Sequence, residues 1–174
     1  MPAPAAADCA IGPAASAASP AQSHRGGPNI NPETGLSTDY LNHFTEAIML
    51  LEMLSTIPEC LDDLRAWQPR TYAEHFAASR FSNREAIIDA YRDADPAVRQ
   101  ALDRASGLLN ATVGRARQLM LQHIGTPEVE AIARRALELL RPLIARTAAL
   151  INGTTIEAAD RQGPQAAIDA MFRR

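Results

Sequence analysis

The 174-residue sequence predicts an all-α protein, a helical bundle of about five to six helices with a long antiparallel helical hairpin in its C-terminal half. Three observations support this fold class. Apolar residues recur at helical spacing from Gly35 onward, helix-start signals precede the apolar runs, and no alternating strand pattern exceeds a few residues. We expect residues 35–153 to form a single domain, because this length is enough to bury a core without disulfides or metals.

The two ends of the chain differ from this domain in composition. Residues 1–34 are rich in Ala, Pro and Ser, and such a segment cannot bury enough apolar surface to offset the entropy lost on ordering. We therefore expect a disordered arm. Residues 154–174 are expected to form a tail with one weak helix, in which Ile168, Met171 and Phe172 recur.

The first two expected helices are marked by their start signals. Ser37 or Thr38 caps a helix over residues 39–55. Pro58 suits the first turn of a short helix, because its missing N–H has no partner there in any case. Gln68-Pro69 ends this short helix, which carries three large apolar residues on one side, namely Leu61, Leu64 and Trp67.

Two capping boxes predict the next two helices. In this motif a Ser or Thr and a Glu three residues later each bond to the other's backbone N–H. Thr71 and Glu74 form the first pattern and Ser82 and Glu85 the second. The apolar and aromatic residues of these helices are Tyr72, Phe76, Ile87, Ile88 and Tyr91.

The two longest apolar stripes predict the hairpin. Asp95 caps a helix with proline in its first turn, and Gly125 ends it. Pro127 opens a second long helix that runs to about Gly153. Only about two residues separate the helices, so they should pack antiparallel. Their stripes contain Val98, Leu102, Ala105, Leu109, Val113, Ala116 and Met120, and then Val129, Ile132, Ala136, Leu140, Leu143, Thr147 and Leu150.

Small residues also recur on the outer face of the first long helix. Gly107, Ala111 and Gly114 lie there at near-helical spacing. Each glycine inside a helix costs about 1 kcal/mol relative to alanine, so two on one face suggest that another helix packs closely against them.

The charged residues exclude several classes of function. The net charge is −3 and acidic and basic residues are interleaved, so the large positive field typical of nucleic-acid binding is absent. All 17 basic residues are Arg. Without Lys there is no Schiff-base lysine, no phosphate-binding P-loop lysine and no Ser-x-x-Lys acyl-transfer motif. We expect no nucleic-acid partner.

The cysteines and the hydropathy indicate a cytoplasmic protein. Cys9 lies in the expected arm and Cys60 on a short helix among apolar neighbours, so we expect neither a disulfide nor a zinc cluster. No uncharged apolar run approaches 18 residues, and the N-terminus lacks the pattern of a secretory leader. We expect no membrane partner.

One face of the first helix carries the candidate metal ligands. Asp39, Asn42, His43 and Glu46 lie at i, i+3, i+4 and i+7, which places them on a common side of a helix. His43 and Glu46 can then ligate one metal from a single helix, as in carboxylate-bridged bundles, although a second copy of the motif is missing. The other candidate ligands are His75 and His123, and the metals would be Fe, Mn or Zn.

These residues also have ordinary structural roles. Asp39 and His43 can hydrogen-bond locally or cap the helix, where Asp39 suits the helix dipole. His123 falls on the apolar stripe near the end of the first long helix. It can be a buried neutral imidazole or can interact with the dipole of that helix. Both alternatives stay open at the level of sequence.

The first helix is also apolar nearly all round toward its C-terminus. Met49 and Met53 stand there among leucines, so this end is either central in the bundle or covered by a partner. Methionine is flexible and suits adaptable protein-binding surfaces. We take Asp39, Asn42, Met49 and Met53 as the candidate interaction residues.

Together these features predict a small cytoplasmic helical protein that acts through protein–protein interaction, as an accessory, adaptor or regulatory subunit. Its partner is another protein or a second copy of the chain. No catalytic motif is present, which argues against an enzyme, and no cofactor is expected. The alternative is a metal-binding helical bundle, such as an oxidoreductase, that uses His43, Glu46, His75 and His123.

Overall fold

A computed structural model describes residues 29–154. Within this range all regular secondary structure is helical, with six α-helices and no strand. This confirms the predicted fold class. A short 3-10 helix, η2, covers Thr38–Leu41. The α-helices are α1 (Asn42–Met53), α2 (Cys60–Ala66), α3 (Tyr72–Ala78), α4 (Arg84–Asp93), α5 (Pro96–Gln122) and α6 (Glu128–Ile151). None of the described helices is long and apolar enough to cross a membrane.

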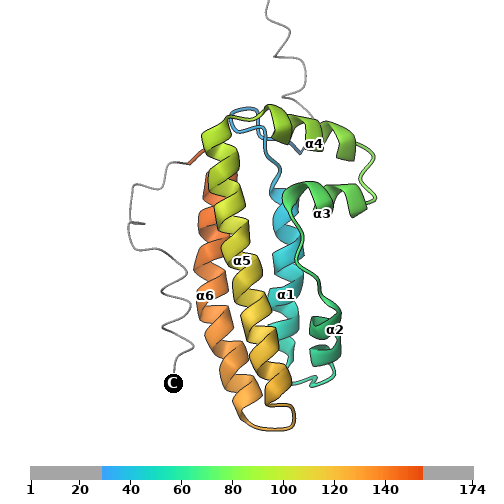
Figure 1. The fold of residues 1–174 in the computed structure, drawn as a ribbon, viewed down its shortest axis with the longest axis vertical. Helices are drawn as coiled ribbons and strands as arrows, with labels where there is room; N and C mark the ends of the chain where they lie inside the picture. The colour runs from blue at the N-terminus through green and yellow to red at the C-terminus, as the bar shows by residue number, and fades with distance from the viewer. Residues whose placement is uncertain (1–28, 155–174) are drawn as a thin grey trace, which may run out of the picture.

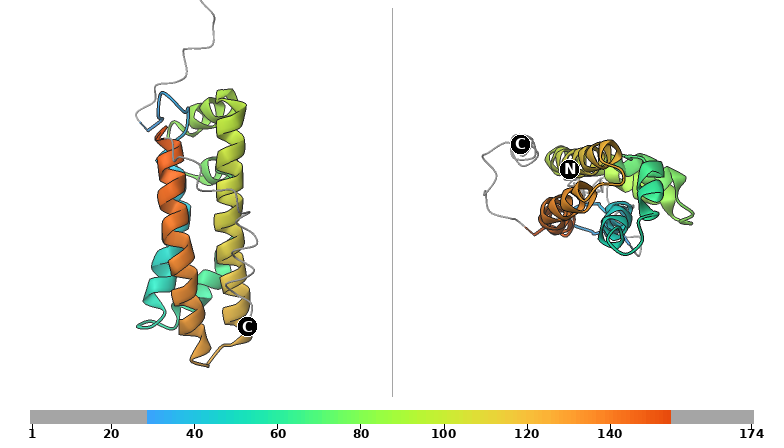
Figure 2. Two further views of the ribbon diagram at one scale, coloured as in Figure 1. Left: turned by 90° about the vertical axis from the view of Figure 1, so that its left-hand side faces the viewer. Right: turned by 90° about the horizontal axis from the view of Figure 1, so that it is seen from below.

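Three long helices form the centre of the molecule. Helices α5 and α6 pack antiparallel along their whole length, and α1 lies against α6 (Figure 1). Seen from below, the three are arranged as a triangle, with α2, α3 and α4 on one side of it (Figure 2). The core lies inside the triangle and under the short helices, and its largest fully buried side chains include Phe44, Leu102, Leu109, Met120 and Leu140.

Most of the predicted helix starts are confirmed. The capping box of α3 is complete, because Thr71 N donates to Glu74 Oε2 at 2.8 Å and Glu74 N donates to Thr71 Oγ1 at 3.3 Å. Asp95 Oδ1 accepts from Ala97 N at 2.7 Å at the start of α5. The box predicted at Ser82 is wrong. Helix α4 begins at Arg84 after Asn83, and no side chain caps it.

The hairpin also forms as predicted. Helix α5 ends at Gln122, earlier than predicted, and Gly125 lies in the turn after it with a φ of 79°. Gly153 follows the end of α6 with a φ of 72°. Both values lie in the left-handed region that favours glycine at helix C-termini. Pro142 lies inside α6 and is exposed, and the carbonyl of Glu138, which loses its usual helical N–H partner, is on the solvent side of the helix as well.

The described chain starts inside the segment that we expected to be a disordered arm. Ile30 and Thr34 are buried, and Thr34 Oγ1 donates to the carbonyl of Ile151 at 2.6 Å. Residues 29–34 therefore close one end of the bundle over the C-terminus of α6. The rest of the expected arm, including Cys9, and the tail helix expected in residues 154–174 lie outside the described residues, except for Thr154.

The segment Trp67–Arg70 between α2 and α3 connects α1 to α5. Arg117 on α5 donates to the carbonyl of Trp67. The carbonyl of Arg70 accepts from Asn110 Nδ2 at 3.3 Å and from the hydroxyl of Tyr40 at 2.8 Å. Because this segment is extended, its carbonyls are free to accept these side-chain donors.

The glycines on the outer face of α5 yield a stability prediction. A Cβ added at Gly107 or at Gly114 meets no other atom within 4 Å. Replacing either glycine with Ala should therefore stabilise the protein by roughly 0.5–1 kcal/mol, because Ala loses less backbone entropy in a helix. Urea denaturation of Gly107→Ala and Gly114→Ala measures the effect.

Gly35 provides the control. It has a φ of 71°, and an added Cβ would lie 3.0 Å from the carbonyl oxygen of Ala90, so Gly35→Ala should destabilise the protein. A loss of stability in Gly107→Ala would show that another chain packs on the outer face of α5.

Candidate functional site

The polar face predicted on the first helix is divided in the structure. Asp39 lies in η2, which has about three residues per turn instead of 3.6, so it does not align with the α1 residues as a continuous α-helix would place it. Asn42 and Glu46 are exposed, whereas His43 is only 4% exposed. On α1 the predicted polar face therefore consists of one buried imidazole and two solvent-facing side chains.

Asp39 serves the local structure. Its carboxylate accepts from Asn29 Nδ2 at 2.8 Å and from Ser37 Oγ at 3.3 Å. Its backbone N–H donates to Ser37 Oγ, which caps η2. These contacts are the local hydrogen bonds that the sequence offered as one alternative for Asp39.

The His43 ring is packed into an aromatic cluster. It stacks on Trp67 with 4.5 Å between ring centroids and 16° between planes. Trp67 Nε1 donates to the carbonyl of His43 at 3.1 Å, so ring and backbone of the two residues are held together. Other members of the cluster are Tyr40, Phe44, Tyr72, His75, Phe76 and Tyr91.

This environment keeps the His43 ring neutral. The pKa of His43 is lowered to about 4, mainly by burial and then by the nearby His75 and Arg70, against a hydrogen bond to the backbone of Gln68 that raises it. Burial and then Arg70 lower the pKa of His75 as well. The two rings are 5.9 Å apart, and His43 Nε2 and His75 Nδ1 are buried without hydrogen-bond partners.

The structure brings together two of the four predicted metal ligands. His43 and His75 are neighbours, whereas Glu46 faces solvent. His123 caps the C-terminus of α5, at the opposite end of the molecule from the start of α1 (Figure 1), and its Nδ1 lies 2.8 Å from the carbonyl of Leu119. Among residues 29–154 no three His, Cys, Asp or Glu side chains are placed to hold one ion. The positive charge of Arg70 also opposes a cation beside these rings.

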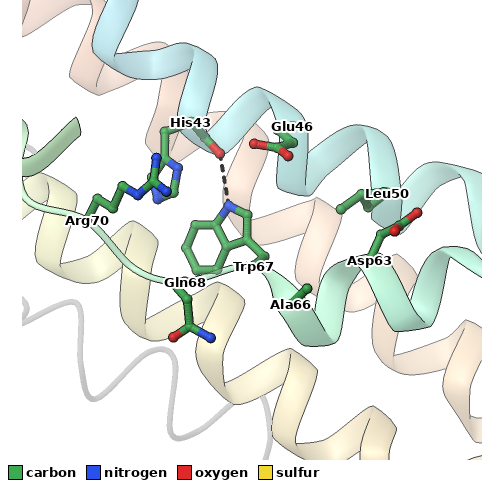
Figure 3. Close-up of a pocket in the computed structure, with 8 residues that line it drawn as sticks. All are labelled: His43, Glu46, Leu50, Asp63, Ala66, Trp67, Gln68 and Arg70. Carbon is green, nitrogen blue, oxygen red and sulfur yellow. Dashed lines mark hydrogen bonds between the residues drawn. The ribbon is translucent and has the colours of Figure 1, made fainter. Parts of the chain in front are cut away.

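A hollow of about 350 Å³ lies between α1 and α2 (Figure 3). Arg70 stands at its His43 end, Glu46 on α1 lies between His43 and Leu50, and Asp63 on α2 lies beside Leu50 at the other end. The remaining lining residues are Ala66, Trp67 and Gln68. The hollow is open to solvent, and its two ends carry opposite charges, on Arg70 and on Asp63.

A second hollow of about 310 Å³ crosses the outer face of α1 and shares Glu46 and Leu50 with the first. Met49 is 54% exposed and Met53 40% exposed in it, and Asn42 and Thr45 complete the lining. Glu52 on the neighbouring polar strip is also exposed and pairs with Arg141. We call the two hollows together the α1 surface.

Exposed large apolar residues are few in the described part of the chain and gather at one end. Besides Met49 and Met53 they are Ile57, which follows α1, and Ile124, at the hairpin turn. The C-terminal end of α1 and the hairpin turn lie at the same end of the molecule (Figure 1). This end therefore carries more exposed apolar surface than the rest of the described structure.

A charge asymmetry that the sequence predictions did not include accompanies this surface. Residues 29–64 contain seven acidic side chains and no Arg, although acidic and basic residues are interleaved over the chain as a whole. A charge count in short windows would have found it. Glu46, Glu59 and Asp63 take part in none of the ion pairs formed within residues 29–154. Trp67 was also missed, because its sequence position indicates only a buried helix residue.

No protein-family model matches the chain, and no curated protein or solved structure matches it. The geometry described above therefore carries the functional argument.

The neutral His43 ring makes stability depend on pH. A folded-state pKa of about 4, below the ordinary 6.5, means that the unfolded chain binds the proton more tightly. The stabilising effect is complete above about pH 6.5 and is lost as the pH falls toward 4, by up to about 3 kcal/mol, because one pKa unit corresponds to about 1.4 kcal/mol. Urea denaturation between pH 7 and pH 4 measures this loss.

His43→Phe is the matched variant, because it keeps an aromatic ring against Trp67 and cannot titrate. His43→Gln is a second variant without a titratable group. Carboxylates titrate equally in all three proteins, so both variants should lose less stability than the wild type over the same pH range. Equal losses would show that the His43 ring is not held neutral by its surroundings.

Proposed function

We propose that this protein acts through protein–protein interaction, as an accessory, adaptor or regulatory subunit, and that the α1 surface is where it makes contact. The observation that carries the proposal is the exposure of Met49 and Met53 beside Leu50 on α1. The sequence left open whether this end of the helix is central or covered by a partner. Within the described structure no other segment covers it.

The chemistry of the α1 surface supports a contact site more than a catalytic one. Met side chains have three rotatable bonds and adapt to the shape of a partner. The only imidazole in the hollow, His43, is buried and has a lowered pKa, so it is poorly placed to exchange protons with a substrate near neutral pH. The partner is another protein or a second copy, and a cytoplasmic setting, where the buried thiol of Cys60 stays reduced, is part of the proposal.

The Met residues give the direct test. Met49→Ser and Met53→Ser should each weaken association by roughly 1–2 kcal/mol, because a truncated interface side chain no longer fills its partner's pocket. Size-exclusion chromatography with light scattering at micromolar concentration, together with co-purification from the native cell, measures association. Circular dichroism and thermal melting should be unchanged, because both side chains are exposed.

Ile124→Ser is the control variant. Ile124 is 54% exposed, as Met49 is, but it lies at the hairpin turn and not on the α1 surface. It should therefore leave association unchanged. A strictly monomeric protein with no co-purifying partner, or equal effects of all three substitutions, would remove the support for the proposal.

The alternative of a metal-binding bundle is favoured by one observation, the two unpartnered ring nitrogens of His43 and His75. Against it stand the charge of Arg70 and the distance to His123. We expect protein purified without a His tag to contain no stoichiometric Fe, Mn or Zn. Elemental analysis decides the matter, and a stoichiometric metal that is lost in His75→Gln would establish the alternative.

A further inference from the structure

The acidic side chains beside the α1 surface indicate the charge of its partner. Glu46 lines both hollows, and Asp63 on α2 lines the first hollow beside Leu50. Both are exposed and outside the described ion pairs. No Arg occurs between residues 29 and 64, and Arg70, which lines the first hollow, stands at its His43 end and forms none of the described ion pairs with them. Basic side chains of a partner are attracted to these two carboxylates, which have no ion-pair partner in the free protein.

The shape of the surface indicates a helix as the partner element. Two hollows flank one ridge on α1, and a neighbouring helix, α2, forms the wall of the first hollow. The second hollow, which holds Met49 and Met53, runs along α1 alone, so a partner helix that lies along α1 would reach α2 only on its first-hollow side. From Asn42 to Met53 the surface is about 17 Å long at 1.5 Å per residue, so roughly three turns of a partner helix cover it.

We propose that the α1 surface binds a basic amphipathic helix of another protein. Its apolar side chains pack against Met49, Leu50 and Met53, and its Arg or Lys side chains lie opposite Glu46 and Asp63. The inference rests on the proposed function and adds the class of partner to it.

One buried group in the first hollow fits the same partner. His43 is 4% exposed and lines this hollow, and its Nε2 has no hydrogen-bond partner. If Nδ1 makes the hydrogen bond to the Gln68 backbone that raises its pKa, then Nε2 of the neutral ring is an acceptor. Arg70 stands at the same end of the hollow and repels a cation there. An uncharged donor of the partner helix, such as a Ser or Asn side chain, therefore satisfies this nitrogen, whereas a carboxylate does not.

A second copy of the chain docked symmetrically on the same surface is less favourable. In a two-fold contact the same patch meets itself, so Glu46 and Asp63 of one chain would approach those of the other. Like charges at close range repel. An anionic membrane surface is disfavoured for the same reason.

A set of three designed peptides tests the inference. Each is an amphipathic helix with the same leucine stripe, and its flanking positions are all Arg, all Gln or all Glu. Fluorescence anisotropy of the labelled peptides with the full-length protein should show the order of affinity Arg, then Gln, then Glu. Binding of the Arg peptide should weaken as salt is raised, because salt screens exposed charges.

Charge reversal on the protein locates the contact. The double variant Glu46→Arg/Asp63→Arg should bind the Arg peptide about tenfold more weakly or worse and bind the Glu peptide more tightly. Glu85→Arg on α4 and Glu138→Arg on α6 are exposed controls that line neither hollow of the α1 surface, and they should change neither affinity. Because all four positions are exposed, the variants should keep the wild-type melting temperature.

The outcomes separate the two proposals. If the Arg and Gln peptides bind equally and both lose binding in Met49→Ser/Met53→Ser, the basic partner is wrong and the contact site stands. If no peptide binds and the Met substitutions leave native association unchanged, both proposals fail. If the Glu peptide binds best, the basic helix is not the occupant. The same holds if light scattering shows a dimer that the Met substitutions dissociate and that no peptide disrupts.

Discussion

The extended segment Trp67–Arg70 holds the rest of this structure in place. The carbonyls of Trp67 and Arg70 accept hydrogen bonds from side chains of α5. The indole of Trp67 lies against the start of α1. Helices α1 and α5 both pack on α6, but they are connected to each other mainly through this segment and the aromatic residues around it. The segment can do this because Pro69 lacks an N–H and disfavours helix in the residue before it, so the backbone stays extended between α2 and α3.

The same constraint decides which side of α1 is buried. Trp67 stacks on His43 and donates to its backbone carbonyl, so the inner face of α1 packs against the aromatic cluster and the core. Met49 and Met53 are then left on the far side of the helix. The exposed apolar surface and the buried unpartnered imidazole are thus two consequences of one orientation, and the proposed contact site includes both.

The electrostatics of the two faces also differ. Inside, burial and Arg70 keep two imidazoles neutral, so this region tolerates little added positive charge. Outside, Glu46 and Asp63 face solvent without a basic neighbour on α1. A basic partner is therefore attracted to the outer ridge, while the neutral interior contributes an acceptor. After Arg25 the next Arg in the chain is Arg65, and most of the Arg residues lie on the later helices.

The sequence by itself determined the fold class, the hairpin and most helix ends, because these depend on local signals. The Thr71–Glu74 box, the Asp95 cap and the glycine at position 125 each act within a few residues. Local signals failed at Ser82 and in the turn before α1, where the 3-10 helix η2 breaks the 3.6-residue spacing. Which face of α1 is buried, and whether His43 meets His75 or His123, was decided only by the tertiary structure. Those outcomes depend on contacts between residues more than twenty positions apart, such as His43 with Trp67, and helical periodicity carries no information about them.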